Sequence, residues 1–553
     1  MIRLSDLLRV LIILLASNAA DVAGLVEDIV RSVRSSLAEK LRQHNRQFAS
    51  LGARLPTELI GSIFSHLSTR DCFAVSQVSY DWRDTALSSP RLWSSPSFLS
   101  KQHHESCTCN ACTDEHSLRP CRECNRSFQL DIPSSNIAPV GELLLRSREV
   151  PISLEVTIRA KARAAAEPCL ELSTALQPHA DRLTTLHIST DDVVAVEQFL
   201  APFGCFSALR TLTIGYGRRT SGLDFKRVDP LELPLLEALT LTGRITCHET
   251  FNLRCPRVTS LTSMFNTARH LRTLLRACPA VETLDLEVGA KSVDTSTETI
   301  LEEVQSLLAN CTLRRVNITR AYRGDVAPVL QLFSTATVQC FRIHFNGTEL
   351  IDSEDLHMFL GDIGDATRLD CVHPTTNAES NLVKLSLFTG IGDDIRERTV
   401  TLQLGEDNDS TDRNFIQVLA RLVRRGDIHE VRVAADFWSS IFDGDDLSST
   451  LPTLKTATIE FGNADDAVNH WFAQRAFTIS SPDRGQLSSL EHLTLKTCSN
   501  TTSMQADEKT ADVVRTALGF CGRLRSLTLD GLSTAVDLKV LHGYLADSVH
   551  LLP

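Results

Sequence analysis

The segment Leu209-Arg-Thr-Leu-Thr-Ile214 has the spacing apolar-x-x-apolar-x-apolar, which is typical of a strand that buries one of its two faces. The same spacing begins again at Leu183, Leu236, Val281 and Leu313. The starts at 183, 209 and 236 lie 26 and 27 residues apart. A short strand that recurs at such an interval predicts stacked repeats whose strands form one sheet.

Helical spacing precedes several of these strands, as at residues 271–275 and 301–308. Strands that alternate with helices predict an α/β fold with a parallel sheet. The repeats are irregular, because only Leu490-x-x-Leu-x-Leu-x-x-Cys498 completes a longer motif and residues 348–378 show no clear unit. This region is similar to an irregular leucine-rich-repeat solenoid, which we expect over residues 149–553.

An earlier segment, residues 55–67, predicts a short helix with two apolar faces. Pro56 suits the first helical position, and Glu58 lies in the first turn, where the helix dipole favours an anion. One apolar stripe consists of Leu59, Ile63 and Leu67, and a second of Ile60 and Phe64. A bundle of about forty residues cannot hide both stripes, so one face is expected to bind a partner.

The next residues predict a second helix. Ser68 and Asp71 have the spacing of a capping box, and Val75, Val78 and Trp82 would share one face of the helix that it opens. Pro90, Leu92 and Trp93 follow and close the unit.

Residues 51–98 therefore resemble the F-box, a small all-α module that docks on a Skp-type adaptor and joins its protein to a cullin-based ubiquitin ligase. Cys72 stands where the family usually has leucine, and Ser79-Tyr80 replaces the frequent Cys-Lys or Cys-Arg. The resemblance implies that the adaptor is bound by a largely apolar set, namely Leu55, Pro56, Leu59, Ile60, Ile63, Phe64, Leu67, Val78, Trp82, Leu92 and Trp93.

The whole arrangement resembles F-box proteins with a leucine-rich-repeat receptor region, of the kind that is abundant in fungi. It implies a non-catalytic substrate receptor whose partners are the adaptor, the cullin ligase core and an unknown target protein, in the cytoplasm or nucleus. Two alternatives stay open. One is a secreted or surface repeat protein, and the other is an F-box protein that acts as a scaffold outside a ligase.

In strands of this spacing, the side chains between the buried positions point to the outer face of the sheet. From Arg315 onward that row becomes mostly basic, which predicts an acidic or phosphorylated target segment. The candidate target-binding residues are Arg315, Arg342, His344, Lys384 and Arg432. A register error of one residue would turn all of them to the other face.

Composition excludes several classes of function. The 553 residues contain 56 Lys and Arg against 68 Asp and Glu, a net charge of −12, which speaks against a nucleic-acid-coating protein. No segment offers about 18 uninterrupted apolar residues, so no membrane span is expected. Motifs of serine hydrolases, phosphate-binding loops, zinc proteases and dinucleotide sites are missing from the sequence, so we expect neither an enzyme nor a cofactor.

A cysteine cluster lies in the insert and linker at residues 99–148. Its two Cys-x-x-Cys pairs would offer four thiolates to a structural zinc ion, namely Cys109, Cys112, Cys121 and Cys124. The spacer of eight residues is shorter than in common zinc modules, which favours a reduced loop without metal.

The first fifty residues predict an amphipathic helical leader. Apolar residues recur at helical spacing between Leu4 and Leu15 and again between Val22 and Leu41. The alternative is a signal peptide, but its unbroken apolar run would extend only from Val10 to Ala16.

Overall fold

The computed structural model describes residues 28–40, 43, 55–67, 69–103, 132–135, 137–158, 162–190, 193–216, 223–225, 230–243, 245–247, 252–265, 267–288, 298–321, 329, 332–333, 338–345, 359–360, 366–372, 382–390, 395–403, 428–434, 453–461, 489–497, 524–530 and 546–552. It divides into two compact units. The first comprises Met1–Pro96 with Glu142–Ile152, and the second comprises Ser97–Gly141 with Ser153–Pro553. Together they give a mixed α/β protein with an N-terminal helical region and a large, mainly parallel sheet.

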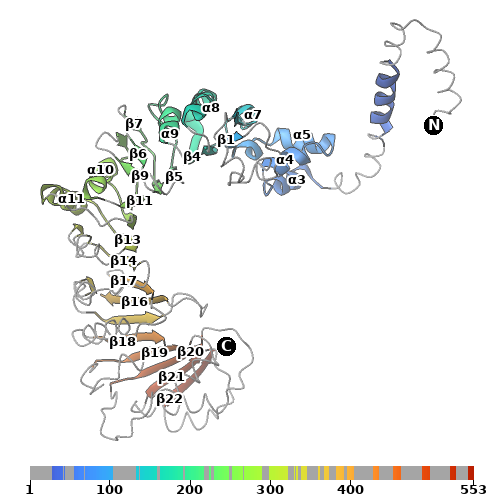
Figure 1. Ribbon diagram of the computed structural model, residues 1–553. Helices are drawn as coiled ribbons and strands as arrows, with labels where there is room; N and C mark the ends of the chain where they lie inside the picture. Colours follow the sequence, from blue (N-terminus) through green and yellow to red (C-terminus); the bar gives the residue numbers. More distant parts are fainter. Residues whose placement is uncertain are drawn as a thin grey trace, which may run out of the picture. The chain divides into compact units, whose positions relative to one another are not determined.

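The helical unit contains a helix at residues 28–40, which lies within the predicted leader. The expected helix between Leu4 and Leu15 and the cysteine cluster from Cys107 to Cys124 lie outside the described residues. The α-helices labelled in Figure 1 are α3 (Thr57–Phe64), α4 (Thr69–Val75), α5 (Tyr80–Ser88), α7 (Ile137–Arg146), α8 (Ala162–Leu176), α9 (Val193–Leu200), α10 (Ala268–Ala277) and α11 (Glu298–Asn310). Two 3-10 helices, η2 (Pro90–Trp93) and η3 (Gln177–Arg182), lie among them along the chain.

The predicted helix through Val75, Val78 and Trp82 is wrong in its extent. Helix α4 ends at Val75, and a new helix, α5, begins at Tyr80. The reason is local, because the Ser79 side chain accepts a hydrogen bond from the backbone N–H of Trp82 at 3.2 Å and caps α5. Val78 therefore lies in the turn between the two helices, with 57 % of its surface exposed.

The described strands begin with β1 (Ser97–His103), β2 (Ile132–Ser135), β3 (Ile152–Ile158), β4 (Leu183–Thr190), β5 (Thr211–Tyr216), β6 (Leu223–Phe225), β7 (Leu231–Glu232), β8 (Ala238–Thr242), β9 (Ile245–Cys247), β10 (Leu253–Arg254) and β11 (Ser260–Phe265). They continue with β12 (Thr283–Val288), β13 (Arg315–Ala321), β14 (Cys340–Phe345), β15 (Arg368–Val372), β16 (Leu382–Thr389), β17 (Arg396–Gln403), β18 (Glu430–Ala434), β19 (Thr456–Phe461), β20 (His492–Thr497), β21 (Leu524–Asp530) and β22 (Ala546–Leu552).

Eighteen of the described strands belong to one sheet, in which β2, β1 and β3 are neighbours in that order. Parallel pairs join β4, β5, β8, β11, β12, β13 and β14 in succession, and β18 to β22 likewise. Between these two series lies an antiparallel meander in the order β17, β16, β15, with β17 parallel to β14 and β15 parallel to β18. The sequence spacing did not predict this reversal.

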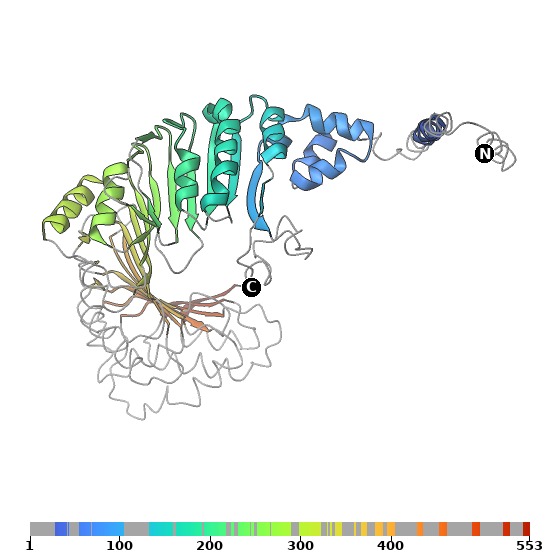
Figure 2. The same cartoon turned by 45° about the horizontal axis from the view of Figure 1, so that its top comes forward.

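The apolar positions of the repeated spacing stack on one another across neighbouring strands. Leu186, Leu212, Leu239, Leu261 and Leu284 are register partners in turn, and all are buried. Helices α8 to α11 lie along the same side of the sheet (Figure 2). This stacking buries one face of these five strands and leaves the intervening residues on the other face.

No helix among the described residues is long and apolar enough to cross a membrane.

Candidate functional site

The core of the helical unit divides the predicted adaptor-binding residues into two groups. Ile60, Phe64 and Trp93 are buried at 7 %, 2 % and 0 % exposure, together with Cys72, Ala86 and Leu143. Leu67, Trp82 and Leu92 pack against this core and are partly buried. These residues hold the module together, since the Trp93 indole N–H donates to the Ala86 carbonyl at 2.8 Å and the Phe64 and Trp82 rings meet edge to face at 5.5 Å.

The second group faces solvent. Leu55, Leu59 and Ile63 are exposed at 42 %, 51 % and 52 %. Leu59 and Ile63 lie four residues apart on one side of α3, and Leu55 lies two residues before this helix. Pro56 is exposed at the start of α3, Val78 is exposed between α4 and α5, and Tyr80 is exposed at the start of α5. We call Leu55, Leu59 and Ile63 the apolar stripe of α3. Three large apolar side chains in water on a short helix and the residues just before it are typical of a surface that a partner covers.

The second candidate surface is the face of the large sheet opposite the stacked leucines, which we call the polar face. Its first row of register partners contains Thr185, Thr211, Ala238, Ser260, Thr283, Arg315, Cys340, Glu397, Phe388, Arg368, Glu430, Thr456, His492, Ser526 and Ser548. The second row contains His187, Thr213, Thr240, Thr262, Asp285, Asn317, Arg342, Thr399, Ser386, Asp370, Arg432, Thr458, Thr494, Thr528 and His550.

The structure brings all five predicted target-binding residues onto this face. Arg315 lies in the first row and Arg342 and Arg432 lie in the second, whereas His344 and Lys384 lie in a third row through Thr401. Buried neighbours on each side of these positions fix the register, for example Val316 next to Arg315 and Ile343 between Arg342 and His344. Whether these residues bind a target stays a prediction.

The row is not mostly basic, however, because β17, which the sequence spacing missed, and β19 add carboxylates to it. Arg342 contacts Glu397 of β17 through Nε at 3.2 Å and a terminal nitrogen at 2.9 Å. Arg432 contacts the Glu460 carboxylate of β19 at 2.6 and 2.8 Å. Two of the predicted cations are therefore neutralised by neighbouring strands.

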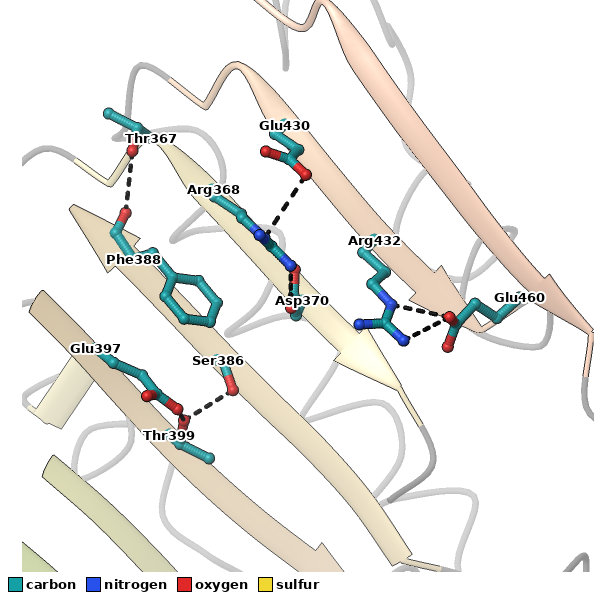
Figure 3. A network of polar contacts seen from close by, with 10 residues as sticks. All are labelled: Thr367, Arg368, Asp370, Ser386, Phe388, Glu397, Thr399, Glu430, Arg432 and Glu460. Atoms are coloured by element: carbon teal, nitrogen blue, oxygen red, sulfur yellow. Dashed lines mark hydrogen bonds and ion pairs between the residues drawn. The ribbon is translucent and has the colours of Figure 1, made fainter. Parts of the chain in front are cut away.

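Figure 3 shows the Arg432–Glu460 pair and a second group of ion pairs around Arg368 of β15. Arg368 donates to both carboxylate oxygens of Asp370 at 2.8 and 2.9 Å and lies 3.7 Å from Glu430. Its guanidinium also lies over the Phe388 ring, 5.0 Å from the centroid. Asp370 is buried at 7 % exposure, so this charge-assisted pair is partly withdrawn from water.

Glu397 is the most connected carboxylate of the polar face. Besides Arg342, the Thr399 hydroxyl donates to it at 2.6 Å and the Cys340 thiol at 3.3 Å. Ser386 in turn lies 2.8 Å from the Thr399 hydroxyl. Burial raises the pKa of Glu397, but the hydrogen bonds and the Arg342 charge outweigh it and hold the pKa below its ordinary value.

The other predicted target-binding residues, Arg315, Lys384 and His344, are not part of these ion pairs. Arg315 and Lys384 form no ion pair with any described residue. Burial lowers the pKa of His344, so its imidazole is neutral near pH 7. Among the five predicted residues, positive charge without an ion pair in the described part of the chain thus lies at Arg315 and Lys384.

Sequence reasoning missed Glu397, Arg368, Asp370 and Glu460. The alternating segment Arg396-Glu-Arg-Thr-Val-Thr-Leu-Gln403 carries the period of a strand, which would have pointed to Glu397. The leucine spacing does not detect it because Arg398 occupies the position where Leu284 and Phe341 stand in other strands, and this arginine is fully buried.

The zinc prediction stays untested, because Cys109, Cys112, Cys121 and Cys124 lie outside the described residues. Within the described part of the chain, no group of three or more His, Cys, Asp or Glu side chains is placed to hold a metal ion.

Comparison with known proteins adds one match. No curated protein matches the chain as a relative. The F-box-like family model matches residues 53–99, which covers the buried core of α3 to η2 and the apolar stripe of α3; the chain therefore contains an F-box-like domain.

Proposed function

We propose that this protein is the substrate-receptor subunit of an SCF-type cullin ubiquitin ligase. The F-box-like domain would dock on a Skp-type adaptor, and the sheet unit would bind the target protein. In this role the chain contributes no catalytic group, and it promotes ubiquitin transfer by holding the target near a conjugating enzyme. The protein would act in the cytoplasm or nucleus.

One observation carries the proposal. The domain that matches the F-box-like model leaves Leu55, Leu59 and Ile63 in water while Ile60 and Phe64 build its core. An apolar stripe with no internal partner in so small a module favours docking, and F-box-like domains generally dock on Skp-type adaptors.

The target-binding role rests on the extended sheet. Repeated strands in register, with helices on one side and polar residues on the other, support a leucine-rich-repeat-like solenoid whose polar face binds a protein. The candidate residues are Arg315, Arg342, His344, Lys384 and Arg432, of which Arg315 and Lys384 offer charge without an ion pair inside the described region.

Affinity purification of the full chain from cells, followed by identification of partners, tests the function. A ligase subunit should recover both the Skp-type adaptor and a cullin. Recovery of the adaptor without a cullin would support a scaffold outside the ligase instead, and recovery of neither would overturn the proposal.

A further inference from the structure

A pocket of about 330 Å³ opens on the polar face where β12, β13, β14 and β17 begin. Arg314, Arg315, Gln339, Cys340 and Glu397 contribute to its lining. This volume is at the lower end of the range of about 300–1,000 Å³ that is typical of ligand pockets. The pocket is polar, and two of its lining side chains are guanidinium groups.

The carboxylate of Glu397, the acidic residue in the pocket lining, already has hydrogen-bond donors. Glu397 accepts hydrogen bonds from Arg342, Thr399 and the Cys340 thiol, and its side chain is 15 % exposed. Burial raises the pKa of Cys340 and Glu397 adds to the rise, so the thiol stays protonated and remains a donor to Glu397. Glu397 is therefore not free to neutralise a further cation.

The two lining arginines have spare charge. Arg314 lies 3.6 Å from Glu282 with 70 % of its side chain exposed, which is a loose surface contact. Arg315 has no ion pair with a described residue and is exposed. Three arginines, Arg314, Arg315 and Arg342, line the pocket or pair with a lining residue. Two carboxylates, Glu282 and Glu397, do the same, so the net charge at the pocket is +1.

The excess of one charge decides between two kinds of anion. A carboxylate carries one negative charge and would balance the pocket. A phosphate monoester carries about −1.5 to −2 at pH 7 and would leave excess negative charge beside Glu397. Ile395 lines the same pocket with 46 % of its surface exposed and can cover the methylene groups of an acidic side chain.

We propose that this pocket binds a carboxylate side chain, Asp or Glu, of an extended segment of the target protein. Arg315 is the principal ligand of the carboxylate, and Arg314 and the Gln339 amide support it. This assignment rests on the proposed receptor function, because it names the chemistry of the target at the polar face.

Saturation-transfer NMR titrations of the full-length protein at low ionic strength test the pocket directly. The probes are the N-acetyl, N′-methylamide derivatives of glutamate, glutamine and phosphoserine. The glutamate derivative should bind at least about tenfold more tightly than the glutamine derivative, since a charge-assisted hydrogen bond is lost. The phosphoserine derivative should bind no more tightly than the glutamate derivative.

Two variants show where the probe binds. Arg315→Gln should weaken binding of the glutamate derivative about tenfold or more. Arg525→Gln is the matched control, because Arg525 is 68 % exposed, pairs with Glu491 of the adjacent repeat as Arg314 does with Glu282, and does not line the pocket. It should leave binding unchanged.

Equal binding of the glutamate and glutamine derivatives would overturn the proposal, as would tighter binding of phosphoserine or an unchanged affinity in Arg315→Gln. The two proposals fail separately. Loss of adaptor binding with retained Arg315-dependent glutamate binding would reject the ligase function and keep the pocket. Intact adaptor binding without glutamate binding would reject the pocket alone.

Discussion

Leu59 and Phe64 lie on the same helix but make opposite contributions, because the first is half exposed and the second is buried against Trp82. A Leu59→Lys/Ile63→Lys variant should leave the domain folded, since both charges stay in water. Phe64→Ala should destabilise the domain by about 3–5 kcal/mol through loss of the buried ring and the resulting cavity. Hydrogen exchange of residues 57–93 in the full chain measures both effects.

An equal loss of hydrogen-exchange protection in the two variants would contradict the division of α3 into an exposed face and a buried face. The comparison also shows that adaptor binding by the apolar stripe of α3 can be tested without changing Ile60 or Phe64. Charge at these two buried positions would unfold the domain and remove binding for an unrelated reason.

A second residue, His270, makes the sheet unit sensitive to pH. Thr267 caps α10 by accepting a hydrogen bond from the His270 backbone N–H. Neither ring nitrogen of His270 has a hydrogen-bond partner among the residues that the structure describes. Burial lowers the pKa of this histidine from 6.5 to about 4. The unfolded chain therefore binds more protons than the folded one between these values, and stability is lost as the pH falls through that window.

We expect the melting temperature to fall between pH 7 and pH 5, with His270 contributing up to about 1.4 kcal/mol per pH unit. In His270→Phe this part of the pH dependence should disappear. Thermal melts of the parent and variant at matched pH values measure the difference. An identical pH dependence in both proteins would rule out His270 as the titrating group.

At the scale of elements, the contact between β14 and the meander depends on Glu397. Its carboxylate joins Arg342 of β14 to Thr399 of β17 while largely buried, so Glu397→Gln should destabilise the sheet by about 1–3 kcal/mol. Glu430→Gln is the control, because Glu430 is 44 % exposed and lies 3.7 Å from its partner Arg368. Denaturant unfolding of both variants measures the effect, and equal losses would contradict the central role of Glu397.

An element was predictable from the sequence to the extent that its local sequence signals agreed with one another. The parallel strands β4, β5, β8, β12 and β13 were predictable because each places leucine, valine or isoleucine at the same two stacked positions, whereas β11 has Leu261 at one and Ser263 at the other. In the meander, the spacing from Leu382 indicated β16, but β17 was missed because Arg398 replaces an apolar residue in that stack, and the antiparallel order was not predictable. The order of strands depends on long-range pairing that no local spacing encodes.

The candidate sites were predictable to different degrees. The sequence indicated that one face of α3 would be left for a partner, but only packing showed that Leu59 and Ile63, not Ile60 and Phe64, lie on it. The register of Arg315 and Arg342 followed from the alternation with Val316 and Phe341. Their charge balance did not, because Glu397 reaches Arg342 from a strand 55 residues further along the chain.

At the scale of the whole molecule, the cysteine cluster makes a separate prediction. The purified chain should contain less than one zinc ion per molecule, because the spacer between the Cys-x-x-Cys pairs is short for a zinc module. Elemental analysis measures the metal content. One tightly held zinc ion per chain that is lost in Cys109→Ser/Cys124→Ser would reverse this prediction.

We propose that the full chain binds a Skp-type adaptor through the apolar stripe of α3. Calorimetric titration of the purified adaptor into the chain tests it most directly. The parent should bind, and Leu59→Lys/Ile63→Lys should weaken binding at least about a hundredfold, because two ions would face an apolar interface. Leu145→Lys is the control, since Leu145 is 65 % exposed on α7, outside the residues that match the F-box-like model. Equal affinity of the parent and the double variant, or no binding by the parent, would show that the chain does not bind the adaptor through this stripe.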